Sequence, residues 1–262
     1  MLIMLSALFK TILYQPIFNA FVALYNIVPG HDVGVVILII TALFRLALYP
    51  LTSSSLKAQK SLQDLQPKLE EIKKKYPADK QAQAQATMEV YKNNKVNPLA
   101  SCLPLLLQLP VIIALYSALR AALSPADFGP LLYSFVKNPG TISPMTLGFL
   151  NLALPSAVLA VLAGIAQFFQ AKSLSRRTPP RGAGSGAKDE DMMASMNKQM
   201  LYVMPVMTVV IGLRLPGGLT LYWFLSTGFM ALQQYFLFKK KDSNTPSAPS
   251  PSSPVIEGTI VK

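Results

Sequence analysis

The sequence is poor in charged residues. Only 14% of its 262 residues are Asp, Glu, Lys or Arg, whereas an average soluble domain has about 25%. Acidic residues are the scarcer kind, with 12 of them against 24 Lys and Arg and a net charge of +12. Hydrophobic residues make up 52% of the chain. This composition is typical of a membrane protein.

The residue types that carry most catalytic and metal chemistry are also scarce. Cys102 is the single cysteine, which excludes an intramolecular disulfide and a multi-cysteine metal site. His31 is the single histidine, and neither a GxxxxGK[ST] loop nor an HExxH motif occurs. We therefore expect no enzyme activity, no metal and no cofactor, and we expect Cys102 to pack as a small apolar residue.

Long apolar segments are abundant, and a helix needs about 20 such residues to cross a bilayer. None of the five longest contains Asp or Glu. Ion-coupled transporters usually place acidic residues or histidines inside their spans, so ion-coupled transport is disfavoured. The expected fold class is an all-α integral membrane protein with five transmembrane helices, at residues 33–52, 99–119, 145–169, 200–215 and 219–238.

The basic residues are distributed unevenly between the two sides of such a bundle. Nineteen of the 24 Lys and Arg fall on one side, which the positive-inside rule places in the cytoplasm. The N-terminus is then outside the membrane and the C-terminus is in the cytoplasm. Because topology accounts for the basic charge, nucleic acid is not expected as a partner. The connecting segments are an external loop at 120–144, a cytoplasmic loop at 172–198 and a Ser/Pro-rich, disordered tail at 242–262.

The N-terminal residues 1–30 are apolar but interrupted by polar side chains. The stretch LFKTILYQPIFNAFVALYNIV is amphipathic and aromatic-rich, which favours a helix lying on the extracytoplasmic membrane surface. The alternative is a sixth span over Leu2–Val28, with the N-terminus inside. A removable signal peptide is disfavoured, because a basic first region and a small-residue cleavage site are missing.

Residues 53–97 have the pattern of a cytoplasmic helical hairpin. Pro77 ends the first helix, and Asp79 is placed to cap a second helix over roughly Lys80–Asn94. The first helix has apolar residues at alternating spacings of three and four, the seam of a coiled coil. These residues are Leu62, Leu65, Leu69, Ile72 and Tyr76.

Arg45 lies inside the first apolar segment, VGVVILIITALFRLALYPL. A charge at the centre of a span costs about 2.5–3.5 kcal/mol on insertion scales, and arginine cannot lose its proton to avoid this cost. Thr41, one turn before, and Tyr49, one turn after, share its face. Since no span contains an acid, water is the expected partner of Arg45 at rest. The alternatives are a structural pairing or a side chain that snorkels to the cytoplasmic surface.

Neutral polar residues mark two other spans. Gln108 is the central polar residue of the second span, and the last span has a stripe at helical spacing. Facing one another, these residues would line a polar cavity, whereas the alternative is that they bridge neighbouring helices. Trp223 could equally be an ordinary packed aromatic. The stripe comprises Thr220, Trp223, Thr227, Met230 and Gln234.

Three strings resemble the YidC/Oxa/Alb family of membrane protein insertases: TALFRLALYPLTSSSLKAQ, YKNNKVNPLASCLPLLLQLPVIIALY and MLYVMPVM…LPGGLTLYWFLS. The likeness covers roughly Asp32–Lys240, with the same order, hairpin position and five-span core. It implies five spans around a hydrophilic groove that is open to the cytoplasm and to lipid and closed on the outside.

The resemblance also implies roles for individual residues. The arginine of the family's first core span corresponds to Arg45, the threonine one turn earlier to Thr41, and the aromatic groove residue of its LYW motif to Trp223. Where the family often has Ser-Asn after this motif, the chain has Ser226-Thr227. The expected substrate groove is Arg45, Thr41, Gln108, Trp223 and Thr227, and the residues expected to capture substrate on the hairpin are Lys73, Lys74 and Lys75.

The implied activity is ATP-independent insertion and folding of nascent membrane proteins in the bacterial inner membrane. The implied partners are nascent membrane proteins, the lipid bilayer, the Sec translocon and the ribosome. Ribosome docking has the least support, because the basic C-terminal extension of some members is reduced to Lys239–Lys241. The alternative from another class is a small transporter or channel with a cationic cavity. A third reading, a factor that assembles membrane complexes, overlaps with the insertase.

Overall fold

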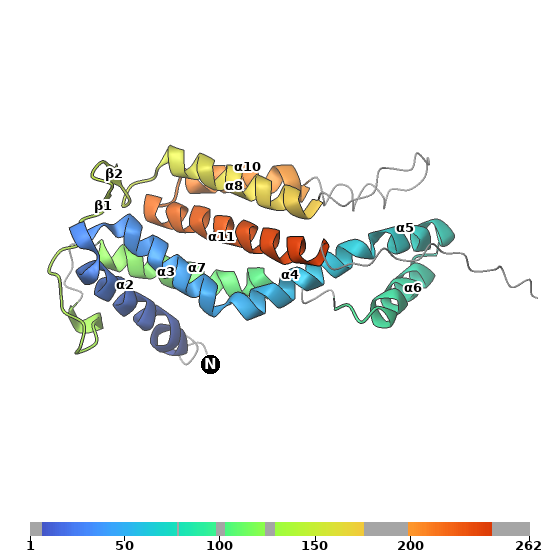
Figure 1. Ribbon diagram of the computed structural model, residues 1–262, viewed down its shortest axis with the longest axis horizontal. Coiled ribbons are helices and arrows are strands. Elements are labelled where there is room, and N and C mark those ends of the chain that lie inside the picture. Colours follow the sequence, from blue (N-terminus) through green and yellow to red (C-terminus); the bar gives the residue numbers. More distant parts are fainter. Residues whose placement is uncertain (1–6, 78, 98–102, 124–128, 176–198, 243–262) are drawn as a thin grey trace, which may run out of the picture.

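The computed structural model describes residues 7–77, 79–97, 103–123, 129–175 and 199–242. Cys102, most of the expected cytoplasmic loop and nearly all of the expected tail lie outside these ranges. The described part is helical apart from one small antiparallel hairpin (Figure 1). Its elements are η1 Lys10–Tyr14, α2 Gln15–Ile27, η2 Pro29–His31, α3 Val33–Ala47, α4 Tyr49–Asp64, α5 Gln66–Lys75, α6 Lys80–Asn93, α7 Leu103–Ala122, η4 Gly129–Leu131, β1 Met145–Thr146, β2 Leu150–Asn151, α8 Ala157–Ser175, η5 Gln199–Val203, α10 Met204–Gly212 and α11 Gly217–Asp242.

The long helices lie side by side, with α11 between two groups (Figure 1). Helices α8 and α10 pack on one side of the bundle, where α8 contacts both α11 and α10. Helices α3 and α7 pack on its other side, and α2 packs against both of them. At one end of the bundle α4 leads out to α5 and α6, while the strands lie at the opposite end. The position of α11 makes it the helix that both groups share.

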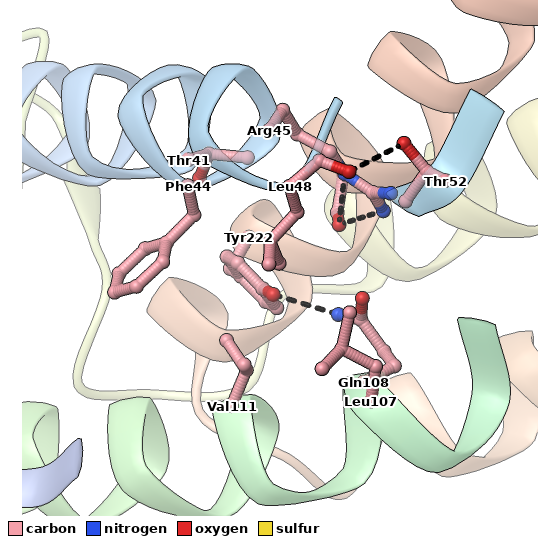
Figure 2. Close-up of a pocket in the computed structure, with 10 residues that line it drawn as sticks. Thr41, Phe44, Arg45, Leu48, Thr52, Leu107, Gln108, Val111 and Tyr222 are labelled. Atoms are coloured by element: carbon pink, nitrogen blue, oxygen red, sulfur yellow. Dashed lines mark hydrogen bonds between the residues drawn. The ribbon is translucent and has the colours of Figure 1, made fainter. Parts of the chain in front are cut away.

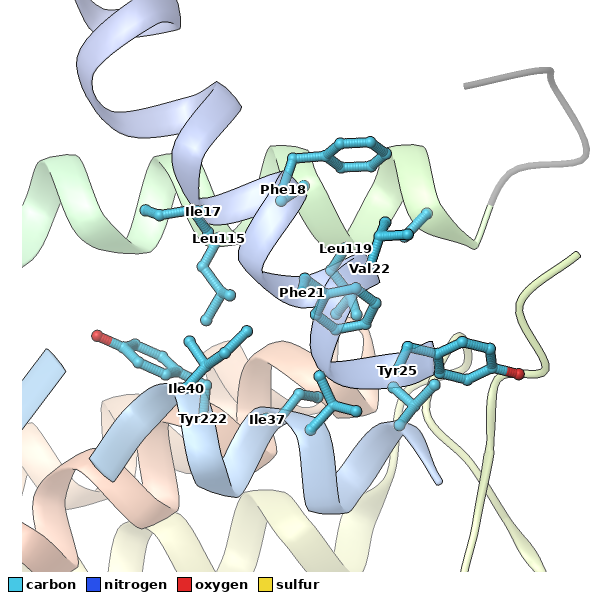
Figure 3. Packing of buried hydrophobic residues seen from close by; sticks show 14 of the residues in the cluster. Ile17, Phe18, Phe21, Val22, Tyr25, Ile37, Ile40, Leu115, Leu119 and Tyr222 are labelled. Atoms are coloured by element: carbon cyan, nitrogen blue, oxygen red, sulfur yellow. The ribbon is translucent and has the colours of Figure 1, made fainter. Parts of the chain in front are cut away.

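The largest buried cluster lies where α2, α3, α7 and α11 meet (Figure 3). Phe18, Phe21 and Val22 of α2 are fully buried and face Leu115 and Leu119 of α7. Ile37 and Ile40 of α3 and Tyr222 of α11 close the cluster from the other side. The N-terminal helix is therefore an integral part of the core.

The N-terminal helix is also the one helix in the described part of the chain that by itself has the length and hydropathy of a membrane span. Residues Ala7–Ile27 have the length and hydropathy of a membrane span, and α3 with α4 do so only when taken together. The remaining apolar helices are shorter, at Leu106–Ala122, Ala157–Ser173 and Leu201–Gly212. Whether Ala7–Ile27 lies on the membrane or crosses it stays a prediction.

The first expected span is interrupted by a bend. Helix α3 ends at Ala47, and the chain turns by 68° before it continues as α4 at Tyr49. Pro50 explains the position of this bend, because proline has no N–H to donate and its ring clashes with the carbonyl four residues earlier. Arg45 therefore lies in the last turn of α3, and Tyr49 belongs to a helix with a different axis. The stripe expected from Thr41 through Tyr49 does not continue past the bend.

The third expected span begins later than its apolar composition implied. Residues 145–151 form the β1–β2 hairpin, and α8 starts only at Ala157. Two positive backbone angles, at Leu147 and Gly148, turn the chain back on itself, and Pro155 precedes the helix. Hydropathy alone did not distinguish this apolar hairpin from the beginning of a helix.

Of the hairpin expected over residues 53–97, helices α5 and α6 form the two arms, whereas residues 53–64 belong to α4. Helix α5 starts with Pro67 in its first turn and ends at Lys75 before Pro77. Asp79 caps α6, as predicted, because its Oδ1 accepts hydrogen bonds from the backbone N–H groups of Gln81 at 3.0 Å and Ala82 at 2.9 Å. Helices α5 and α6 contact each other, and Leu69 of α5 is buried.

Small residues allow α8 and α10 to approach closely. A side chain at Gly164 would meet Val209 and the carbonyl of Pro205, and one at Gly212 would lie 3.0 Å from Ala160. Close approach through small residues is a common way for helices to associate in membranes. Thr208 adds a hydrogen bond to Gln167 across the same interface.

We predict that Gly164→Leu destabilises the protein by about 1–3 kcal/mol, the usual cost of overpacking a core. The matched control is Gly228→Ala in α11, where a new Cβ meets nothing within 4 Å. This control should be neutral or stabilising by about 0.5–1 kcal/mol, because alanine is the better helix former. Thermal unfolding of the purified proteins in detergent measures both, and equal midpoints would contradict the α8–α10 contact.

Candidate functional site

A small pocket with both apolar and polar side chains in its wall lies between α3, α7 and α11, just before the bend (Figure 2). Its space is about 10 Å³, which is about the size needed to hold one water molecule. No Asp or Glu is among the lining residues. They are Thr41, Phe44, Arg45, Leu48, Thr52, Leu107, Gln108, Val111, Tyr222 and Ser226.

Arg45 points across the pocket toward α11 rather than away from the bundle. Its Nε donates a hydrogen bond of 3.1 Å to the hydroxyl oxygen of Ser226, and a terminal guanidinium nitrogen donates to the same oxygen. The guanidinium is half-buried and has a neutral partner, so its positive charge is solvated by a dipole and not cancelled. The partner expected from the sequence was water. Within the described residues, the hydroxyl of Ser226 is the hydrogen-bond partner of the guanidinium, which agrees with the alternative of a structural pairing.

Gln108 links the second helix to the same site. Its side-chain N–H donates a 2.6 Å hydrogen bond to the hydroxyl of Tyr222, which joins α7 to α11 (Figure 2). Thr41 is fully buried in the pocket wall, but its hydroxyl donates to the carbonyl of Ile37 in its own helix at 2.6 Å. Thr41 thus forms part of the pocket wall, but its hydroxyl hydrogen is already used in a hydrogen bond within α3.

A second polar cluster lies beyond the bend, where α4 contacts α11. Gln233 of α11 donates to the hydroxyls of Thr52 and Ser53, both at 2.9 Å, and to the carbonyl of Tyr49 at 3.3 Å. These bonds satisfy backbone and side-chain groups that the bend at Leu48 would otherwise leave open. Thr52 also lines the pocket, so the two clusters form one continuous polar path on this face of α11.

The structure brings together three of the five expected groove residues. Arg45, Thr41 and Gln108 line one pocket, whereas Trp223 and Thr227 do not line it. The stripe predicted for the last span faces the other helices. Thr220 donates to the carbonyl of Gly212 at the end of α10, and Met230 accepts from Gln170 of α8.

The residues that the sequence reasoning missed are Tyr222 and Ser226, with Thr52 and Gln233 behind them. Tyr222 and Ser226 are one helical turn apart, and Gln233 follows two turns later on the same face. This spacing was visible in the sequence and competed with the stripe through Trp223. A helix turns by roughly 100° per residue, so choosing the neighbouring residue selected a different face of α11.

The three lysines of the hairpin are far from this pocket. Lys74 and Lys75 are exposed near the end of α5, and the Nζ of Lys75 lies 5.5 Å from the ring centre of Tyr76. Figure 1 shows α5 and α6 extending beyond the end of the bundle. Within the described ranges, no three His, Cys, Asp or Glu side chains gather in a way that suits a metal ion.

Comparison with known proteins identifies the family. Residues 23–244 match the model of the 60Kd inner membrane protein family. A Fusobacterium nucleatum protein named membrane protein insertase YidC is 40% identical over 207 residues, which are 79% of this chain and 86% of that protein. The chain belongs to the YidC/Oxa1 family. It is thus a multi-pass inner-membrane protein.

Other YidC proteins show the same relationship over different lengths. The protein from Oceanobacillus iheyensis is 33% identical over 79% of this chain and 74% of its own length. The protein from Geobacter metallireducens is 32% identical over 87% of this chain, but the match covers only 37% of that protein. The chain therefore spans most of some YidC proteins and little more than a third of others.

We predict that Ser226→Ala destabilises the protein by about 1.5–3 kcal/mol, the usual effect of removing a hydrogen bond to a charged group. Thr227→Ala, the next residue on α11, is the matched control and should have a smaller effect because Thr227 does not contact the guanidinium. Thermal unfolding in detergent measures both. A double-mutant cycle with Arg45→Gln should show coupling for Ser226 and none for Thr227, and equal coupling would contradict the pairing.

Proposed function

We propose that the pocket between α3, α7 and α11 receives the hydrophilic segment of a nascent membrane protein during insertion. The chain belongs to an insertase family and is not an enzyme, so its substrates are nascent membrane proteins. The observation that carries the proposal for the site is the position of Arg45. Its cation is held inside the bundle by a neutral hydroxyl.

An uncancelled charge at this depth attracts an acidic segment strongly. Two opposite charges 4 Å apart interact with about 4 kcal/mol at an effective dielectric constant near 20, against about 1 kcal/mol in water. A carboxylate in the tail of a substrate would replace Ser226 as the partner of Arg45. Because Ser226 is neutral, this exchange breaks a hydrogen bond and no ion pair, which makes the interaction reversible.

The neutral polar groups supply the rest of a transient binding surface. Gln108, Tyr222 and Gln233 each have donors or acceptors that can exchange with the backbone of an entering segment. The pocket has space for about one water molecule, so a segment can enter only when the helices separate. The Gln108–Tyr222 hydrogen bond joins α7 to α11, and we infer that it opens when substrate enters.

No ATP is required in this mechanism. The apolar part of the substrate leaves sideways into lipid, where burial of apolar surface releases about 25 cal/mol per Å². The polar segment needs only a local decrease in the cost of entering the bilayer. The proposed mechanism is therefore limited to short translocated segments.

The arrangement of charges at the two ends of the bundle supports an orientation. The lysine-rich α5–α6 hairpin extends from one end, and Asp32 lies at the other end, where α3 begins. We place the hairpin in the cytoplasm, following the positive-inside rule. Five helical segments then cross the membrane, namely α3, α7, α8, η5 with α10, and α11.

The hairpin is proposed to contact substrates before the pocket does. Lys73, Lys74 and Lys75 are consecutive at the end of α5, and they would attract acidic segments from the cytoplasm. The Sec translocon is a further proposed partner on the same side. Ribosome docking through Lys239–Lys241 has less support, because these are the only basic residues near the end of α11.

We predict that Arg45→Ala lowers insertion of single-span substrates with acidic tails by at least tenfold, since a loss of roughly 1.4 kcal/mol already has that effect. The assay is protease accessibility of the tail in cells depleted of their own insertase. Arg45→Lys should retain most activity, because charge and not guanidinium geometry is required. Arg214→Ala is the matched control, an exposed arginine outside the pocket.

The same assay with the tail carboxylates changed to Asn or Gln tests the electrostatic part separately. Those substrates should depend little on Arg45. If Arg45→Ala supports acidic tails as well as the wild type does, the proposed role of the charge is wrong. Insertion and ion flux measured in the same liposomes distinguish an insertase from a channel, for which flux without an added substrate is expected.

We also predict that a photo-crosslinking amino acid reacts with a stalled nascent chain more strongly at position 222 than at position 223. Tyr222 lines the pocket, and Trp223 does not. Both residues are adjacent in α11 and aromatic, so the substitution is equally conservative at both. Equal or reversed crosslinking yields would place the substrate on the α8 side of α11.

A further inference from the structure

The chain between α7 and α8 ends in an uncharged stretch that is bound tightly to the bundle. No Asp, Glu, Lys, Arg or His occurs from Asn138 to Ala171. This stretch includes the β1–β2 hairpin, in which Met145 pairs with Asn151 and Thr146 with Leu150. The hairpin lies at the end of the bundle opposite α5 and α6 (Figure 1).

The tip of this hairpin, Leu147–Gly148–Phe149, is apolar and exposed. Leu147 is 71% exposed and Phe149 75%. Leu147 and Gly148 have φ angles of +52° and +80°, which is typical of a tight hairpin turn that favours Asn, Asp or Gly. Leucine rarely adopts a positive φ angle, and exposure of its apolar side chain to water is unfavourable. Its presence calls for a reason other than turn formation.

The base of the hairpin is fixed to the first turn of α3 through Asp32. Asp32 caps α3 by accepting from Gly34 N at 2.8 Å and Val35 N at 3.1 Å, and it also accepts from the Thr146 hydroxyl and from Leu147 N at 2.7 Å. Burial alone raises the pKa of Asp32, but these hydrogen bonds stabilise the carboxylate and bring its pKa below the ordinary value. A side chain at Gly34 would collide with Thr146, so the approach is close.

The segment that follows β2 is fixed to the start of α11. The backbone N–H groups of Gly217 and Gly218 donate to the carbonyls of Leu154 and Leu152, both at 2.9 Å. The hairpin therefore joins the first turns of α3 and α11, the two helices that carry Arg45 and Ser226. Movement of the hairpin tip relative to these helices is restricted on both sides.

The exposed apolar surface continues from the hairpin into α8. Leu154 is 60% exposed and Val158 68%, and they lead at helical spacing into the outer face of α8. In a multi-pass membrane protein such a face contacts lipid acyl chains. That face continues through Val161, Ile165 and Phe169.

We propose that the hairpin tip inserts into the lipid interface and anchors the first turns of α3 and α11 there. Lipid is the occupant that the surface favours, because the tip has no charged or polar side chain with which to specify a protein partner and adjoins the lipid-facing side of α8. Peripheral segments bind the membrane interface by burying their exposed apolar side chains at the boundary between headgroups and acyl chains. With the orientation proposed above, the leaflet is the extracytoplasmic one.

The test measures the depth of the tip in liposomes of bacterial phospholipid. A fluorophore is attached at Leu147→Cys or Phe149→Cys in a Cys102→Ser chain, with Lys137→Cys, exposed on the same loop, as the matched control. We expect phospholipid carrying a nitroxide near the top of its acyl chain to quench both tip labels strongly. Iodide in the water should quench them roughly half as well as the control or less.

Two results overturn the proposal. If iodide quenches the tip labels as well as the control, the tip lies in water. If neither quencher reaches them, a protein surface such as a second copy of the chain covers the tip. Where the labelled variants misfold, Phe149→Trp with Trp223→Phe gives the same information, since brominated lipid should quench its emission. Leu147→Asn, which suits the turn, should fold normally and decrease that quenching.

Discussion

The hydrogen bonds between Arg45 and Ser226 join the two helices on which the site is built. Arginine in an apolar helix has to be solvated by something, and here a serine hydroxyl of α11 does so at 3.1 Å from Nε. The pairing brings α3 against α11 at the level of the pocket and directs the charge inward. A carboxylate in the place of Ser226 would have made a stronger pair but would have cancelled the charge. The neutral partner keeps the cation available.

Helix α11 is held to α3 and α4 at three levels along its length. At one end the β1–β2 hairpin joins the first turns of α3 and α11 through backbone hydrogen bonds and Asp32. In the middle is the Arg45–Ser226 pair, and beyond the bend Gln233 binds Thr52 and Ser53. Against α7, by contrast, the polar link at the pocket is the Gln108–Tyr222 bond. These contacts favour opening of the site by displacement of α7, with α3 and α11 as the fixed pair.

A fixed α3–α11 pair with a more weakly linked α7 agrees with what an insertase has to do. The substrate needs a polar surface that exists before it arrives, because building one in the bilayer would leave unsatisfied groups. It also needs a weak site, since the segment has to leave again. Single hydrogen bonds to neutral groups meet both conditions better than an ion pair would. Membership of the YidC/Oxa1 family establishes the class of activity, and the pocket is the physical route that we propose for it.

Hydropathy and charge determined the membrane class, the position of Arg45 and Gln108 in apolar helices, and the helical hairpin with Asp79 as a cap. These follow from local properties: partition of a segment into lipid, helix capping and breaking by proline. The bend at Leu48 is also local in origin, because Pro50 follows it, although hydropathy did not reveal it. Tertiary structure decided the hairpin at residues 145–151 and the side of α11 that faces the pocket. A strand and a helix of equal hydropathy partition into lipid equally well, so hydropathy does not distinguish them. A polar residue in the sequence likewise does not show which neighbouring helix it will face. Tyr222 and Ser226 therefore replaced Trp223 and Thr227 in the pocket, because packing of α8 and α10 against one side of α11 left the other side to face Arg45.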